Sequence, residues 1–214
     1  MRSLLAPGAI FTGACNAVIS DTGYAITLAA GCFLSLPNVN FKEAKWTMFI
    51  VLSLRDNRPL QRRGLFSVCV GSNSPVMDLT VDVDGTIHER LLSADGTSLV
   101  QTARFMHPDG DLQRPFLYAV RVRPTATGMD MSSFLGRQTA AAMRPAMTSL
   151  GGTARIVLGA DADDGPCKMQ NAAALAPPPI TAPILNVHAF QIYADALTDN
   201  DLMEVRSYIT RQWQ

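Results

Sequence analysis

The last thirty residues constrain the fold of this chain more than any other segment. Residues 185–193 read Leu-Asn-Val-His-Ala-Phe-Gln-Ile-Tyr, an apolar run typical of a β-strand. Thr198 and Asp201 then have the spacing of a capping box, which predicts that a helix begins there and runs to Trp213. The apolar stripe of that helix consists of Leu202, Val205 and Ile209. We therefore expect the chain to close with a strand, a tight turn and an amphipathic helix that packs its stripe on the core.

Further short strands are predicted along the chain. Residues 46–54 are almost continuously apolar and β-favouring, which indicates a central strand buried on both faces. Asp84-Gly85 suits a tight turn with positive φ, so residues 76–92 are expected to form a hairpin. The remaining strands are expected at residues 64–70, 98–105, 114–122 (ended by Pro124) and 154–159. Many short strands separated by turns favour a sandwich.

Length and charge limit the classes of protein that this chain can belong to. Its 214 residues are enough for one buried core, and we predict a single domain over residues 1–214. The 18 basic and 18 acidic residues give a formal net charge of +0, so neither nucleic acid nor an anionic membrane is an expected partner. No stretch approaches the ~20 apolar residues of a membrane span, and Pro7 and Gly8 interrupt the first apolar run, so neither a transmembrane segment nor a signal peptide is predicted.

Three motifs resemble those of one known family. The C-terminal motif combines the strand that ends at Tyr193, the run Ala196-Leu197-Thr198-Asp199 and a helix that ends in Arg211-x-Trp213. Residues 32–37 and the pair Leu158-Gly159 are similar to an early and a penultimate segment of the same family. The family is that of laminin-G-like, concanavalin A-like jelly rolls. The resemblance implies an all-β, two-sheet antiparallel jelly-roll sandwich with a short C-terminal α-helix over residues 198–213, and it implies binding rather than catalysis.

Two segments exceed a minimal sandwich. Residues 125–153 are rich in Ala, Thr, Ser, Gly and Met and are predicted to be an insertion, partly helical around Ser132–Met143. Apolar side chains on an exposed loop would be unfavourable in a lone protein, so we expect them to pack on a neighbouring subunit, or alternatively on their own sandwich. The protein-interface candidates are Met129, Met131, Phe134, Met143 and Met147. The second of these segments, residues 176–183, is expected to be an extended polyproline connection. Apart from these two, residues 1–30 can form an extended N-terminal segment.

No catalytic constellation can be assembled from the sequence. Asp78, Asp82 and Asp84 share one strand face, but the chain has no Glu-x-Asp-x-Glu motif of concanavalin-like glucanases, so we expect a solvated outer face. None of the three histidines, His88, His107 and His188, lies in a nucleophile motif. His188 is expected to be a hydrogen-bonded sandwich residue on the strand face of Phe190 and Ile192, and His107 to be part of a loop. We therefore predict that the protein is not an enzyme.

Cofactor and metal sites are equally weak in the sequence. The acidic run with Asp161, Asp163 and Asp164 offers oxygen ligands for calcium, but a polar turn explains the same residues, and no cofactor is predicted. The four cysteines, Cys15, Cys32, Cys69 and Cys167, have no metal-ligand spacing and are interpreted as reduced, buried thiols of a protein made in a cytoplasm. The only basic cluster, Arg58, Arg62 and Arg63, is interpreted as an exposed loop or a subunit salt-bridge site.

The sequence thus leaves two hypotheses. The first is a non-enzymatic structural protein of a large assembly, most plausibly a bacteriophage virion component such as a capsid decoration or a tail-associated jelly roll. Its partners would be other copies of itself and other virion proteins, and the attribution to a virion comes from the family resemblance. The second is a carbohydrate-binding, lectin-like module that recognises cell-surface or host glycans. Only 7% of the residues are aromatic, which limits the number of rings that could stack on a sugar.

Overall fold

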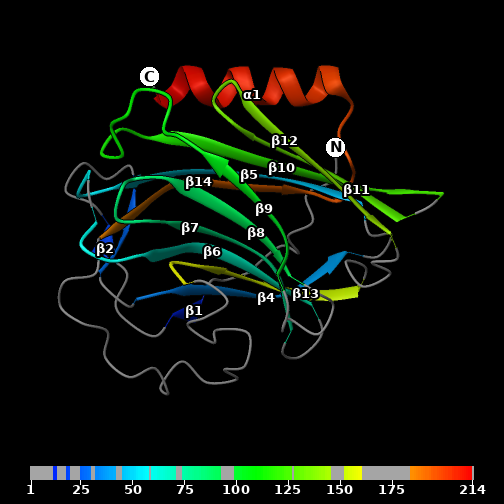
Figure 1. The fold of residues 1–214 in the computed structure, drawn as a ribbon, viewed down its shortest axis with the longest axis horizontal. Coiled ribbons are helices and arrows are strands. Elements are labelled where there is room, and N and C mark those ends of the chain that lie inside the picture. Colours follow the sequence, from blue (N-terminus) through cyan, green and yellow to red (C-terminus); the bar gives the residue numbers. More distant parts are fainter. Residues whose placement is uncertain are drawn as a thin grey trace.

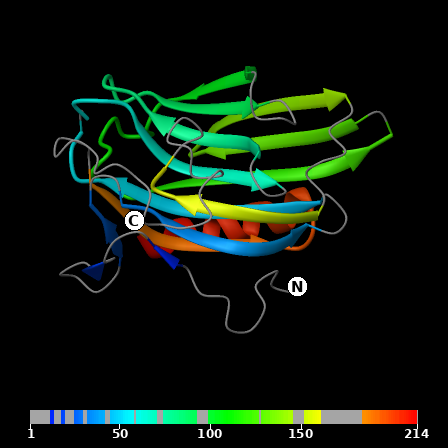
Figure 2. The same ribbon diagram turned by 90° about the horizontal axis from the view of Figure 1, so that it is seen from below.

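The structure is a computed structural model, and it describes residues 12–13, 18–19, 25–29, 32–41, 45–57, 59–70, 74–92, 99–126, 128–145, 152–160 and 184–213. Over these ranges two antiparallel sheets of seven strands each pack face to face. A single described helix lies on the outer face of one sheet (Figure 1). This arrangement is the predicted all-β sandwich with a C-terminal helix, and Figure 2 shows the two layers from below.

Each sheet gathers strands from distant parts of the chain. The first sheet has the order β1 (Thr12–Gly13), β4 (Leu34–Phe41), β13 (Gly152–Leu158), β6 (Arg63–Val70), β7 (Ser74–Val81), β8 (Ile87–Leu92) and β9 (Leu99–Phe105). The second sheet has the order β12 (Gln138–Pro145), β11 (Gly128–Leu135), β10 (Phe116–Thr125), β5 (Trp46–Leu54), β14 (Leu185–Tyr193), β3 (Ile26–Leu28) and β2 (Val18–Ile19). The helix α1 (Asp199–Trp213) follows β14 directly.

Strand β5 is central and buried on both faces, as its composition predicts. All nine of its residues are buried. Met48 and Ile50 belong to the core between the sheets, whereas Phe49 and Val51 pack under α1. A strand between two apolar layers needs no alternation of apolar and polar residues, which explains the continuous apolar run.

The C-terminal helix has the predicted cap and the predicted buried stripe. The Thr198 hydroxyl accepts a hydrogen bond from the Asp201 N–H at 3.2 Å and donates to Asp201 Oδ2 at 2.7 Å, so an N-terminal donor of the helix is satisfied. Leu202 and Ile209 are each 3% exposed, and Val205 is half-buried beside them. The helix therefore covers the outer face of the second sheet.

The segment 125–153 corrects the sequence prediction. Its Ala-rich composition favours a helix, but residues 128–145 form the hairpin β11–β12, which extends the second sheet beyond β10. Within β11, Met131 faces the sandwich core and is 4% exposed, whereas Phe134 faces α1. Pairing with β10, rather than the local composition, determines the conformation.

Two glycines explain turn motifs of the sequence. Gly85 has a φ of +83° and ends the predicted turn between β7 and β8. Gly159, with a φ of +91°, follows β13 so closely against the chain that a Cβ would lie 2.7 Å from the Cys32 carbonyl oxygen. Pro124 does not end β10 as predicted, since the strand continues to Thr125. A proline has no N–H to donate, but the pairing of β10 with β5 already ends at Val122, so Pro124 interrupts no hydrogen bond between these two strands.

The interpretation of the cysteines as reduced thiols is wrong for the two that the structure describes. Cys32 and Cys69 are both disulfide-bonded. The side chain of Cys69 is 1% exposed and packs with Phe33 and Val157. Disulfides persist mainly in oxidising environments, so this finding argues against a reducing cytoplasm as the working environment.

Candidate functional site

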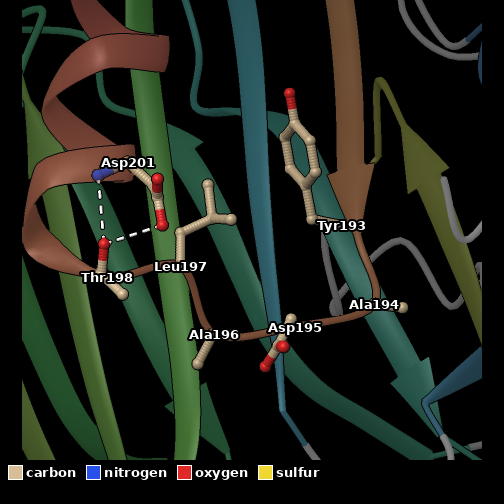
Figure 3. Close-up of a pocket in the computed structure, with 7 residues that line it drawn as sticks. All are labelled: Tyr193, Ala194, Asp195, Ala196, Leu197, Thr198 and Asp201. Carbon is tan, nitrogen blue, oxygen red and sulfur yellow. Dashed lines mark hydrogen bonds between the residues drawn. The ribbon is translucent and has the colours of Figure 1, made fainter. Parts of the chain in front are cut away.

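A hollow lies at the turn between β14 and α1, and it is the candidate binding site of the described chain. Its volume is about 280 Å³. Figure 3 shows Tyr193 on one side and Leu197, Thr198 and Asp201 on the other, with Asp195 between them along the turn. The residues that line it are Tyr193, Ala194, Asp195, Ala196, Leu197, Thr198 and Asp201.

Tyr193 supplies the aromatic wall of the hollow. Its ring is half-buried and meets the Phe49 ring edge-on, with 5.8 Å between the centroids. Its hydroxyl donates to Gln191 Oε1 at 3.1 Å. Burial raises the pKa of Tyr193, so the hydroxyl stays protonated at neutral pH, and with its hydrogen donated to Gln191 its oxygen remains an acceptor.

The turn itself is fixed by two side chains of the neighbouring strands. Thr47 on β5 is fully buried, and its hydroxyl donates to the Asp195 carbonyl at 2.9 Å and accepts from the Leu197 N–H at 3.0 Å. Arg121 on β10 donates from Nη1 to the Leu197 carbonyl at 2.9 Å. Because both anchors lie on a packed sheet, the hollow is preformed rather than dependent on a free loop.

Carboxylates dominate the rim of the hollow. The Asp195 side chain is 68% exposed and lies 3.5 Å from Lys45 Nζ. Asp199 accepts a hydrogen bond from Arg121 at 2.6 Å, and that hydrogen bond and the charge of Arg121 lower the pKa of Asp199. Asp201 completes the helix cap on Thr198. Their carboxylate oxygens are hydrogen-bond acceptors, and none is arranged as an attacking group.

A serine and a histidine come together near the other end of α1, but they do not form a catalytic pair. Ser53 Oγ lies 2.9 Å from His188 Nε2, and the His188 ring contacts Trp213 with 5.1 Å between the centroids. Ser53 is only 2% exposed, so a substrate cannot reach it. His188 Nδ1 has no hydrogen-bond partner in the described part of the chain, so no third group orients the ring as a triad would require.

The position of His188 corrects one prediction and confirms another. A bulge in the pairing of β14 with β5 falls between Val187 and Ala189. The extra residue reverses the faces along β14, so His188 lies on the helix side with Ser53, whereas Phe190 packs against the core between the sheets. The predicted hydrogen bond is present, but the predicted face is wrong. Burial lowers the pKa of His188, which favours the neutral ring.

The other two histidines have structural roles in loops and strand ends. His107 is 6% exposed, and its Nδ1 accepts hydrogen bonds from the N–H groups of Asp109 at 3.1 Å and Asp111 at 3.2 Å. Burial lowers the pKa of His107, consistent with an unprotonated acceptor nitrogen. His88 Nε2 lies 3.0 Å from Asp82 Oδ2 at the β7–β8 turn.

The three aspartates predicted to form a solvated face do not all do so. Asp84 is exposed and accepts a hydrogen bond from the Thr86 N–H at 2.8 Å, which lowers its pKa. Asp78 is fully buried and accepts two hydrogen bonds from Arg90, from Nε at 2.8 Å and from Nη2 at 2.5 Å. The prediction is therefore wrong for Asp78. Arg90, its partner on β8, supplies the hydrogen bonds that water would supply to an exposed carboxylate.

One glutamate lies inside the sandwich. Glu89 is 2% exposed and accepts a hydrogen bond from the Tyr118 hydroxyl. Burial and then the neighbouring carboxylate raise the pKa of Tyr118 well above its usual range. Glu89 is enclosed and Asp78 is engaged with Arg90, so neither can act on a glycosidic bond as a glycosidase pair would.

The remaining candidates of the sequence are dispersed. Arg63 is 5% exposed and donates to the Ala29 carbonyl at 3.2 Å, which contradicts an exposed role, whereas Arg62 is exposed. Arg58 lies outside the described residues. Asp161, Asp163 and Asp164 also lie outside them, so the calcium hypothesis stays a prediction. Within the described ranges no group of three or more His, Cys, Asp or Glu side chains could hold a metal ion.

The interface candidates of the insertion differ in location and burial. Met131 is buried in the sandwich of its own chain, so it is not available to a partner. Phe134 is half-buried against α1, and the Arg206 guanidinium lies 4.9 Å above its ring. Met129 and Met143 lie on β11 and β12, and Met147 lies outside the described residues.

Of the six exposed large apolar side chains in the described ranges, three lie at the end of the sandwich opposite the hollow, and the others are Ile26, Met203 and Tyr208. Leu60 is 78% exposed, and Val83 and Met106 are each 54% exposed. They lie in the connections β5–β6, β7–β8 and β9–β10, which the strand pairing places at one end. Sequence analysis missed this end, because each residue is a single apolar position within a polar loop.

Comparisons with known proteins identify the fold. No protein-family model matches the sequence, and no curated protein matches it. Among solved structures, the chain is similar to botulinum neurotoxin type C in a structure that concerns interaction with two ganglioside molecules, with 12% identity, a TM-score of 0.64 and coverage of 96% of this chain and 47% of that chain. It is also similar to the binding domain of botulinum neurotoxin DC in complex with SialylT, with 10% identity, a TM-score of 0.63 and coverage of 96% and 46%.

A third similar structure is the botulinum neurotoxin DC binding domain in complex with rat synaptotagmin II, with 10% identity, a TM-score of 0.64 and coverage of 96% and 47%. The chain therefore has the β-sandwich fold of these solved structures and spans about half the length of these neighbours. At this identity the likeness shows the fold alone. In the described part of the chain no helix is long and apolar enough to cross a membrane.

Proposed function

We propose that this chain is a non-enzymatic carbohydrate-binding module and that the hollow between β14 and α1 is its binding site. The observation that carries the proposal is the combination of an aromatic wall, Tyr193, with the exposed acceptor Asp195 and the half-buried Asp201 on a rigidly held turn. The ganglioside and SialylT structures among the fold neighbours support the ligand class. The disulfide bonds of the described cysteines suit a protein that works outside a reducing cytoplasm.

The size of the hollow suits one sugar ring. Its volume of about 280 Å³ lies just below the ~300–1,000 Å³ that is usual for pockets of drug-sized ligands. A sugar ring presents C–H groups on its faces and hydroxyl groups around its edge. The faces can pack on the Tyr193 ring, while the hydroxyls donate to carboxylate oxygens.

The test is a glycan array followed by calorimetric titration of the best ligand. Asp195→Asn is the informative variant, because Asp195 lines the hollow but is not part of the helix cap. Hydrogen bonds to charged groups contribute ~1.5–3 kcal/mol, so we expect the variant to bind about tenfold or more weakly. Asp56→Asn, an exposed carboxylate at the opposite end of the sandwich, is the matched control and should bind normally.

Two outcomes would contradict the proposal. One is the absence of any glycan that binds with millimolar affinity or better. The other is a glycan whose affinity is unchanged in Asp195→Asn and reduced in Asp56→Asn, which would place the site at the opposite end of the molecule.

A second candidate function is a structural role in an assembly, and the exposed Leu60, Val83 and Met106 favour it. These side chains form an apolar end that would be covered in a complex of several copies. The surface differs from the predicted one, since the hairpin β11–β12 is part of the sheet. A virion as the site of that assembly stays a prediction from family resemblance. Light scattering of the wild type and of Leu60→Ser tests the role, because an oligomer should dissociate in the variant, and a monomeric wild type would exclude self-assembly.

A further inference from the structure

We infer that the hollow selects uncharged glycans and rejects glycans that end in an anionic sugar such as sialic acid. This inference rests on the proposed function and specifies its ligand class. It sets the chain apart from its fold neighbours, which include a complex with SialylT. Three features carry this inference: the charges at the rim, the negative charge in the first turn of α1 and the hydrogen bonds that engage the buried Arg121.

The rim carries more negative than positive charge. Asp195 and Asp201 line the hollow, and Asp199 lies between them in the sequence with its side chain 82% exposed. Among the described basic side chains, Lys45 lies 3.5 Å from Asp195, and the charges of Arg121 and Arg123 act on Asp199, which is not a lining residue. A sugar carboxylate in the hollow would therefore face the two lining carboxylates, Asp195 and Asp201, and no described lining residue carries a positive charge.

The helix N-terminus does not compensate for these carboxylates. Helix N-termini attract anions when their N–H groups and positive dipole end are free. Here the Asp201 N–H is bound to the Thr198 hydroxyl, and the side chains of Asp199 and Asp201 already place negative charge in the first turn. Two carboxylates of the protein thus already lie in the first turn of the helix, and they reduce its attraction for an anionic ligand.

The nearby buried arginine is also engaged. Arg121 is 6% exposed, and its Nη1 donates to the Leu197 carbonyl and to Asp199 at 2.9 and 2.6 Å. It supports the turn from beneath and is not among the residues that line the hollow. No arginine fork is therefore presented to a ligand carboxylate in the described part of the site.

The hydroxyl groups of a neutral sugar suit the same surroundings. Each hydroxyl is a donor, and the rim offers carboxylate acceptors on one side and the Tyr193 hydroxyl on the other. Repulsion of a single ligand charge by two carboxylates about 4–6 Å away corresponds to a loss of about tenfold in affinity at low ionic strength. The loss should shrink as salt screens the exposed charges.

The experiment compares glycan pairs that differ only in a terminal sialic acid, with lactose and sialyllactose as the soluble probes. Titrations of both probes are made at low and at high ionic strength. We expect lactose to bind about tenfold more tightly at low ionic strength, with a smaller ratio at high ionic strength. The ratio should also fall in Asp195→Asn, whereas Asp56→Asn should keep the wild-type ratio.

The outcomes separate this inference from the proposed function. Equal or tighter binding of sialyllactose at low ionic strength would overturn the inference and leave carbohydrate binding intact. A preference for lactose that is unchanged by salt and by Asp195→Asn would also overturn it, because the selection would then be steric. Absence of binding for every array pair, neutral and sialylated, would contradict the proposed function and with it the inference.

Discussion

Replacing Thr47 by valine should loosen the turn that builds the hollow. Valine has nearly the same shape as threonine but lacks the hydroxyl, which in the protein bonds the Asp195 carbonyl at 2.9 Å and the Leu197 N–H at 3.0 Å. Each lost hydrogen bond removes ~0.5–1.5 kcal/mol, and a buried N–H without a partner costs ~1–3 kcal/mol. The Leu197 N–H is buried, so we expect the free energy of unfolding to fall by about 2–4 kcal/mol.

Urea unfolding, followed by circular dichroism, measures this loss. Thr47→Ser is the matched control, because it keeps the hydroxyl and removes only a methyl group, which is worth about 1 kcal/mol. The reasoning is refuted if Thr47→Val unfolds at the wild-type urea concentration, or if Thr47→Ser is as destabilised as Thr47→Val. A stable Thr47→Val protein would mean that the turn is held by contacts other than this hydroxyl.

Three further predictions concern stability. Leu202→Ala should cost about 2–5 kcal/mol, since this side chain of α1 is 3% exposed and packs on the second sheet, and a wild-type melting temperature would contradict the packing of the helix. Asp78→Asn should cost about 3–5 kcal/mol, because it leaves the Arg90 charge without its bidentate partner, and urea unfolding would expose an error if the loss stayed below about 1 kcal/mol. Burial lowers the pKa of His107 and His188 below the ordinary 6.5. Below about pH 6.5 the unfolded chain therefore binds more protons than the folded chain. The free energy of unfolding should be constant above about pH 6.5 and fall as the pH drops below it. Urea midpoints across this range test the pH dependence, which should weaken in His107→Asn, and stability that rises on acidification would contradict the sign.

Local patterns predicted much of the fold. The strand bounds 46–54 and 185–193 coincide with β5 and β14, because continuous apolar runs and their flanking turns are local features. The Thr198 cap and the Gly85 turn are also local, since each depends on residues within a few positions.

Features that depend on pairing with distant strands were not predictable. The bulge at His188 reverses the faces of β14, and nothing in residues 185–193 signals it. Asp78 looks solvated in its own strand, yet Arg90 of the neighbouring strand buries it. The Ala-rich segment 125–153 has a helical composition, but residues 128–145 within it form the hairpin β11–β12, whose first strand pairs with β10.

The candidate site shows the same division. The sequence singled out residues 193–201 as a fold motif, and the hollow lies within them. Its support comes from Thr47 and Arg121, which are 150 and 76 residues from Leu197 in the chain, so no spacing rule could associate them with the turn. Of the two alternatives for Met131, contact with a neighbouring subunit or packing on its own sandwich, the structure shows the second, because an alternating strand places that side chain in the core.

The most direct test of glycan binding at this turn is chemical-shift mapping by NMR of the isotope-labelled protein with the best glycan from the array. The account predicts that amide shifts on titration are concentrated in residues 193–201, with smaller changes at Lys45 and Thr47. Shifts concentrated instead around Leu60, Val83 and Met106, with the 193–201 amides unmoved, would contradict it.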